Sequence, residues 1–236
     1  MNGLVKILLA FLFAATFTLA ADKPVAEAVY SPADVALTTD PSSEFWHAAR
    51  AVYLERDIQG KDAQNVHSEV RIRWTKNNLY FLFVCPYDEL YLKPSPTITQ
   101  ETNELWNWDV AEVFIGANFT DINRYQEFEV SPQGEWIDLD IDLHKPHHEV
   151  GWTWNSGFEK SASVDTAAHR WYAAMRIPLS AIDHRPPTAG NTFRMNLFLS
   201  EGAPSNHHEV AWHPPMSNTF HVPERFGLLK LVEEKP

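Results

Sequence analysis

The sequence predicts an all-β protein folded as an antiparallel β-sandwich of the jelly-roll or immunoglobulin-like type. Apolar and polar residues alternate with a period of two in several short segments, which is the pattern of half-buried strands. Turn-forming sequences such as Lys76-Asn77-Asn78 and Pro132-Gln133-Gly134 separate these segments. Almost no stretch has helical periodicity. Many short strands bounded by such turns are typical of two packed sheets.

The first residues, Met1–Ala20, have the pattern of a cleaved export signal. One basic residue, Lys6, precedes an apolar run from Ile7 to Phe17, and small residues stand at the end where a signal peptidase cuts. The run is shorter than the roughly 20 residues that a membrane span requires. We therefore expect cleavage after Ala20, a secreted or periplasmic product, and no membrane association after cleavage.

The remainder of the chain is expected to form one domain. We expect residues 21–35 to be a loose lead-in and residues 36–236 to form a single β-sandwich domain, because no internal repeat or low-complexity linker divides them. The formal net charge of −12 argues against a nucleic-acid partner, because phosphates bind to basic surfaces. An uncharged partner such as a sugar is compatible with this charge.

The expected strands differ in how they are buried. Leu79–Cys85 is apolar on both faces, as a central strand would be, whereas Trp136–Leu143 alternates apolar residues with Asp138, Asp140 and Asp142 on a face expected to be solvated. Ser180–Asp183 is expected to form one helical turn. The expected strands are Val66–Trp74, Leu79–Cys85, Val110–Ala117, Asn123–Ser131, Trp136–Leu143, Trp171–Ile177, Thr192–Ser200 and Gly227–Val232.

Cys85 is the only cysteine, so it has no partner for an intrachain disulfide. It lies in the apolar run Leu79–Cys85. Buried free cysteines usually behave as small apolar core residues, and we expect Cys85 to be one of them.

Tryptophan is abundant, with nine residues in the chain. Sugar binding requires flat aromatic surfaces for the apolar faces of pyranose rings, with carboxylates and amides nearby for the hydroxyls. Three tryptophans are expected to anchor the core: Trp46, Trp74 and Trp171. Five lie outside the strict strand alternation, where loop residues can form a binding site: Trp106, Trp108, Trp152, Trp154 and Trp212.

The order of several motifs resembles the family 9 carbohydrate-binding modules, within the wider DOMON-like sandwich superfamily. The resemblance extends from about Asp40 to Val232. The motifs are Asp40 and Trp46, Val70-x-Ile-x-Trp74, Trp106-Asn-Trp-Asp-Val-Ala-Glu112, Ile177-Pro-Leu, Arg194-Met-Asn196, Trp212 and Phe226-Gly-Leu-Leu. The resemblance implies a non-catalytic module that binds a mono-, oligo- or polysaccharide and assists polysaccharide breakdown. It also implies calcium ions that support the fold.

The family resemblance assigns roles to individual residues. In the family, two tryptophans clamp a sugar while a glutamate, an arginine and amides bind its hydroxyls. Trp106 and Trp212 match the clamp, Glu112 matches the glutamate, and Asn196 lies on the strand that carries a polar ligand.

Two positions depart from this family pattern. Glu129 stands where the family has its arginine, with Ser131 at the adjacent polar position, and Phe198 replaces an expected amide. Because a carboxylate accepts hydrogen bonds where an arginine donates them, the family's usual ligand is not implied for this chain. Alternation still places Glu127, Glu129 and Ser131 on one face, and Arg194, Asn196 and Phe198 on one face.

Other functions remain open from the sequence. A haem carrier of the DOMON-like type could use histidines with Met175, Met195 or Met216. A hydrolase could use Asp109 and Glu112 as a carboxylate pair. The histidine clusters match no standard zinc spacing, whereas calcium at strand ends remains an alternative, where the candidates are Asp88, Glu89, Asp109 and Asp121.

Overall fold

The computed structural model describes residues 23–63 and 67–234, so the expected signal segment and Val66 lie outside the described residues. The described chain is almost entirely strands. These are β1 Val25–Tyr30, β2 Arg50–Leu54, β3 Arg56–Asp57, β4 Ser68–Trp74, β5 Asn78–Pro86, β6 Val110–Gly116, β7 Arg124–Val130, β8 Trp136–Asp142, β9 Glu159–Asp165, β10 Arg170–Pro178, β11 Thr192–Glu201, β12 His208–Ala211 and β13 Gly227–Val232.

The helical elements within the described residues are short. They are α1 Glu44–His47 and the 3-10 helices η1 Leu105–Asn107, η2 His148–Thr153, η3 Leu179–Ala181 and η4 Pro223–Arg225. The expected helical turn at Ser180–Asp183 is confirmed in η3. Each strand expected from the alternation is present, with ends that differ by at most two residues in the described chain.

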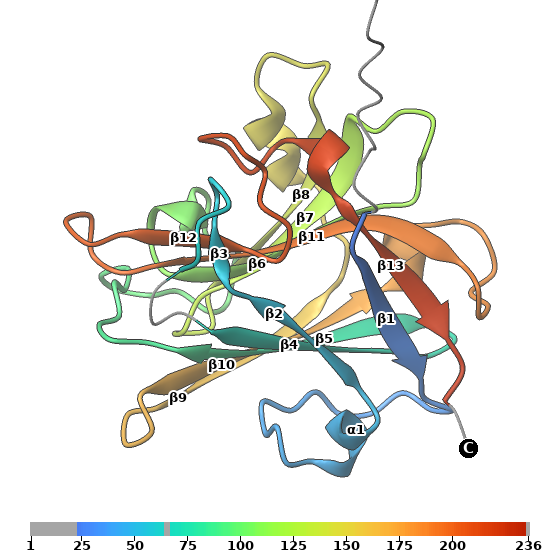
Figure 1. Ribbon diagram of the computed structural model, residues 1–236, viewed down its shortest axis with the longest axis horizontal. Coiled ribbons are helices and arrows are strands. Elements are labelled where there is room, and N and C mark those ends of the chain that lie inside the picture. The colour runs from blue at the N-terminus through green and yellow to red at the C-terminus, as the bar shows by residue number, and fades with distance from the viewer. Residues whose placement is uncertain (1–22, 64–66, 235–236) are drawn as a thin grey trace, which may run out of the picture.

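The strands form one continuous sheet that folds over on itself into a sandwich (Figure 1). Its order is β8-β7-β6-β11-β13-β1-β4-β5-β10-β9, with β12 beside β11 and β2 beside β4. The half β8-β7-β6-β11 lies over the half β4-β5-β10-β9, and β13 and β1 connect the two along one side. The predicted all-β sandwich is confirmed.

The N-terminal segment departs from the prediction. Residues 21–35 were expected to be a loose lead-in, but Val25–Tyr30 forms β1, which pairs in parallel with both β13 and β4. The sheet is therefore mostly, not entirely, antiparallel. Ala26 and Ala28, which face the core, are small, so this segment has a weaker apolar alternation than the strands that the sequence predicts.

The main core lies between the two halves of the sheet. Val113 and Phe128 from one half, and Ile72 and Phe83 from the other, belong to one cluster of buried side chains. Cys85 is fully buried in the same cluster, as expected. The tryptophans expected to anchor the core are all buried: Trp46, Trp74 and Trp171.

The opposite, outer face of β6, β7, β8 and β11 is also covered. Phe114, Ile137 and Phe198 form a second buried cluster there with Phe226, from the segment that joins β12 to β13. Trp106 from η1 packs against the edge of this cluster. The two faces of this half therefore differ in role, since one packs on the core and the other carries a layer of loops.

The face of β8 that carries the aspartates was expected to be solvated, but it is only partly so. Asp140 is exposed, but Asp138 is buried and one of its oxygens accepts a hydrogen bond from Ser156 N at 2.6 Å. The segment that follows η2 covers this part of the strand, which is why the alternation alone misjudged it.

Candidate functional site

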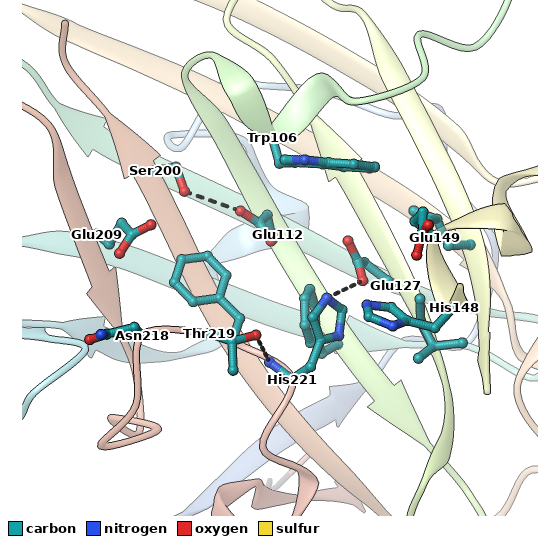
Figure 2. Close-up of a pocket in the computed structure, with 14 residues that line it drawn as sticks. Trp106, Glu112, Glu127, His148, Glu149, Ser200, Glu209, Asn218, Thr219 and His221 are labelled. Atoms are coloured by element: carbon teal, nitrogen blue, oxygen red, sulfur yellow. Dashed lines mark hydrogen bonds and ion pairs between the residues drawn. The ribbon is translucent and has the colours of Figure 1, made fainter. Parts of the chain in front are cut away.

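A cavity of about 370 Å³ opens on the outer face of β6, β7 and β8. This volume is within the range of small-molecule sites. Its floor is formed by strand residues such as Glu112, Phe114 and Glu127. Its walls come from η1, η2 and the loop between β12 and β13, and this loop is distant in sequence from the strands of the floor (Figure 2).

Aromatic side chains line two sides of the cavity. Trp106, which is partly exposed, lies above the floor in Figure 2, with Glu112 and Glu127 below its ring. On the loop side, Phe220 stacks on the buried Phe198 with ring centroids 4.2 Å apart and an interplanar angle of 3°. The residue Phe198, which departs from the family pattern, therefore supports the cavity wall from beneath.

Three glutamates converge at the base of the cavity. Glu112 on β6 is the direct cross-strand partner of Glu129 on β7, and Glu127 is the next residue of β7 on the same face. One carboxylate oxygen from each lies within 4.8 Å of those of the other two. All three are buried, and Glu129 lies behind Glu112 and Glu127 rather than in the cavity lining. This register confirms that Glu127 and Glu129 share a face.

These carboxyls have few partners among the described residues. Ser200 Oγ donates to Glu112 Oε1 at 3.3 Å, whereas both oxygens of Glu129 are buried without a hydrogen-bond partner. Burial, together with the neighbouring carboxylates, raises the pKa of Glu112 and Glu129 well above the usual value. Burial likewise raises the pKa of Glu127.

His221 occupies the corner beside Glu127. Its Nδ1 and the Tyr125 hydroxyl share a hydrogen bond of 2.6 Å, and its Nε2 lies 4.0 Å from Glu127 Oε2. Burial, and next the nearby His148, lowers the pKa of His221 to about 4. The imidazole is therefore neutral at neutral pH and supplies no positive charge to the glutamates.

The predicted site residues are only partly brought together. Trp106 and Glu112 line the cavity, and Glu129 lies directly beneath it. Asn196 does not line the cavity, because its side chain accepts from His213 N at 3.1 Å and donates to His213 O at 2.8 Å. Ser131 also lies elsewhere, with its hydroxyl donating to Glu135 at 2.8 Å.

Trp212 does not face Trp106 across this cavity, as the family resemblance implied. Its backbone N–H donates to Leu197 O directly after β12. Alternation along this segment places Val210 and Trp212 against the inter-sheet core and Ala211 on the cavity side. The facing wall is formed by Phe220 and His221 instead.

The alternative catalytic pair does not share a cavity. Both oxygens of Asp109 accept backbone hydrogen bonds, from Tyr91 N at 2.8 Å and Gly202 N at 2.7 Å, and the side chain is fully buried. Asp109 thus ties two loops to the start of β6. Burial raises its pKa to about 6.

None of the methionines named for a haem site lines the cavity. Met175 and Met195 are buried in the core between the sheet halves, whereas Met216 is exposed on a loop beside Gly60.

Sequence reasoning missed several residues of the cavity. The period-two pattern of β7 had placed Glu127 beside Glu129, so a signal for it existed. The residues of the walls had no such signal, because η2 and the loop before β13 lack periodicity. These residues are His148, Glu149, Asn218, Phe220 and His221, and Glu209 was missed with the strand β12 that carries it.

Residues 41–234 match the sequence model of the family described as Carbohydrate family 9 binding domain-like. The chain belongs to this family. A family 9 module from Caldicellulosiruptor kristjanssonii in complex with cellotriose has a similar fold, with a TM-score of 0.62 at 14% identity, covering 90% of this chain and 95% of that one. Its glucose complex gives 0.60 at 16% identity, covering 89% and 97%.

The chain also has a relative that is similar in sequence. An extracellular protein of Arthroderma benhamiae is 25% identical over 156 residues, which cover 60% of this chain and 68% of the relative. At 14% and 16% identity, the likeness to the two solved structures shows the fold of the family 9 domain. The chemistry of the cavity depends on the residues of this chain.

Proposed function

We propose that this family 9 domain binds an uncharged saccharide in the cavity beneath Trp106. The observation that carries the proposal is the combination of an accessible indole with hydroxyl-binding side chains in one open cavity. The C–H-rich face of a pyranose ring packs on an aromatic face. The oxygens of Glu112, Glu127 and Glu209 would accept hydrogen bonds from the sugar hydroxyls.

The charged side chains that line the cavity determine which saccharides can bind. The described lining residues include four glutamates and neither Lys nor Arg. Glu129 stands beneath the cavity at the position that matches the family's arginine. In the protein free of bound cations, an anionic sugar such as a uronate would meet carboxylates and neither Lys nor Arg, so it is disfavoured. Family 9 modules solved with cellotriose and glucose support an uncharged ligand.

The wider role follows from the family and the N-terminal pattern. We propose that the protein is exported and assists polysaccharide breakdown without catalysing it. The extracellular relative supports export, as does the expected signal at Met1–Ala20. No helix in the described part of the chain has the length and apolar character needed to cross a bilayer. The use of both Asp109 oxygens in backbone contacts supports a binding role.

Calorimetric titration with cellotriose, xylo-oligosaccharides and oligogalacturonates tests the binding proposal. With EDTA present, an uncharged oligosaccharide is expected to bind more tightly than the uronates. Trp106→Ala should weaken binding at least tenfold, which corresponds to about 1.4 kcal/mol. The matched control is Trp108→Ala, since Trp108 lies two residues away, outside the cavity lining, near Lys93. Absence of any saccharide binding, or wild-type affinity in Trp106→Ala, would refute the proposal.

A further inference from the structure

We propose that Glu112, Glu127 and Glu129 form a binding site for one divalent cation of the oxygen-preferring class, such as Ca²⁺ or Mn²⁺. The site lies at the base of the cavity. Its role toward a saccharide, given below, rests on the proposed function.

The positions of the three carboxylates suit a shared ion. Oxygens that bind Ca²⁺ at 2.3–2.6 Å lie no more than about 5 Å from one another. The three glutamates each offer an oxygen within 4.8 Å of the other two. The antiparallel register holds them there, because Glu112 and Glu129 are direct partners and Glu127 is next to Glu129 on the same face. No other group of three metal-binding side chains in the described residues is as close.

The second observation is that the most deeply buried member has no partner. Glu129 is 0% exposed, and apart from the adjacent Glu127 carboxyl neither of its oxygens has a hydrogen-bond partner among the described residues. Oε2 of Glu127 is also buried without one. No ion pair joins Glu112 or Glu129 to a described Lys or Arg. Burying unpaired carboxylates is costly, so the cluster needs a positive charge from outside the described side chains or shared protons.

The ligand chemistry selects the class of ion. Carboxylate oxygens suit Ca²⁺, Mg²⁺ and Mn²⁺, whereas zinc prefers nitrogen and sulfur ligands. One imidazole is near: His221 is fixed by Tyr125, and its Nε2 lies 4.0 Å from Glu127. Titration with Mn²⁺ beside Ca²⁺ tests whether His221 Nε2 also binds the ion.

The cation would face the ligand cavity. Glu112 and Glu127 line the cavity while Glu129 lies behind them, so protein ligands occupy one side of the ion and the other side is open. Figure 2 shows the first two carboxylates pointing into the space beneath Trp106. Neighbouring hydroxyls of a sugar are suitable oxygen ligands for such open positions. The cation would then supply a positive charge at the base of the site, where the family pattern has an arginine and this chain has Glu129.

The test begins with the metal alone. The full chain is dialysed against EDTA, then into chelator-free buffer, and titrated with CaCl₂ or MnCl₂ in a calorimeter. One ion per chain is expected. At a free concentration of about 100 times Kd, the unfolding midpoint should rise by about 5–10 °C. Glu129→Gln should abolish both effects, and Glu112→Gln provides a second variant if the first does not fold. No binding by the wild type, or unchanged binding in a folded Glu129→Gln, overturns the proposal.

A matched control separates the cluster from buried glutamates in general. Glu135 is fully buried but accepts from Ser131 and lies 3.9 Å from Lys93, away from the cavity. Glu135→Gln is expected to bind the cation as the wild type does. Loss of cation binding in this variant would contradict the assignment of the site.

Saccharide binding measured with and without the cation distinguishes the proposed saccharide site from the proposed cation site. Oligosaccharide affinity is measured with EDTA and with the saturating cation, and a fall of at least tenfold in EDTA is expected. Equal affinity in both would show that the cation does not contact the ligand. Cation binding with no saccharide binding under either condition would leave the metal site standing and refute the proposed function.

Discussion

At Asp34, one carboxylate fixes the turn between β4 and β5. It accepts hydrogen bonds from the side chains of Thr75 at 2.5 Å, Asn77 at 2.6 Å, Asn78 at 2.8 Å and Tyr80 at 3.1 Å. Burial alone would raise the pKa of Asp34, but the four donated hydrogen bonds outweigh it and lower the pKa to about 2. A single residue thus holds the N-terminal loop against a turn some 40 residues away.

Asp34→Asn should destabilise the protein by about 1–2 kcal/mol at pH 7, a modest value because the site is solvent-accessible. The folded-state pKa is depressed, so the stabilisation is present above about pH 4 and is lost as pH falls toward 2. The difference between variant and wild type should shrink over that range in urea unfolding. Asp62→Asn, at a site 85% exposed, serves as control and should change little. A pH-independent difference would contradict this account.

Glu129 stands where the family pattern has an arginine, so a hydrogen-bond acceptor replaces a donor. This replacement affects more than one contact. An arginine at the matching family position would complement Glu112 directly across the strands. Glu129 instead places a third carboxylate there, with its oxygens unpartnered in the described residues. A carboxylate accepts hydrogen bonds where an arginine would donate them, so the chemistry at the base of the cavity differs from that of the family pattern.

Among the elements, η2 positions one wall of the cavity. It carries His148 and Glu149, and its Gly151 packs against the backbone of the edge strand β8. A Cβ atom at Gly151 would lie 2.3 Å from Asp140 O, closer than real contacts allow. Only glycine permits η2 to approach the strand so closely.

Gly151→Ala should therefore push η2 off β8. We expect a loss of about 1–3 kcal/mol in the free energy of unfolding and a several-fold weaker saccharide affinity, because the wall moves with the helix. Chemical unfolding and calorimetric titration measure the two effects. Thr153→Ala on the same element, where the side chain is exposed, is the control. Wild-type stability of Gly151→Ala would show that the backbone contact is not as close as described.

At the scale of the whole molecule, β1 and β13 join the two halves of the sandwich. β1 pairs in parallel with β13 over five residues and with β4 over two. Arg73 on β4 donates from its guanidinium to the carbonyls of Val29 and Tyr30. The strand at the N-terminal end of the described chain therefore seals one side of the core.

Removing residues 23–31 should abolish cooperative unfolding, because the edges of β13 and β4 lose their partner and the core opens between them. A chain that begins at residue 23 is the control and should keep a sharp thermal transition. Circular dichroism during heating compares the two. A truncated chain with the control's midpoint would show that β1 is dispensable.

Alternation in the sequence alone identified eight of the thirteen strands in the described residues, and it missed β1, β2, β3, β9 and β12. Alternation is local, so the shared face of Glu127 and Glu129 and the burial of Cys85 could be predicted from it. Only the tertiary structure decided which face becomes a cavity, because Phe220 and His221 reach it from a loop about 100 residues distant in sequence from the strands they cover. It also turned Trp212 toward the core and made β1 a strand. Such pairings depend on long-range packing, which no local pattern encodes.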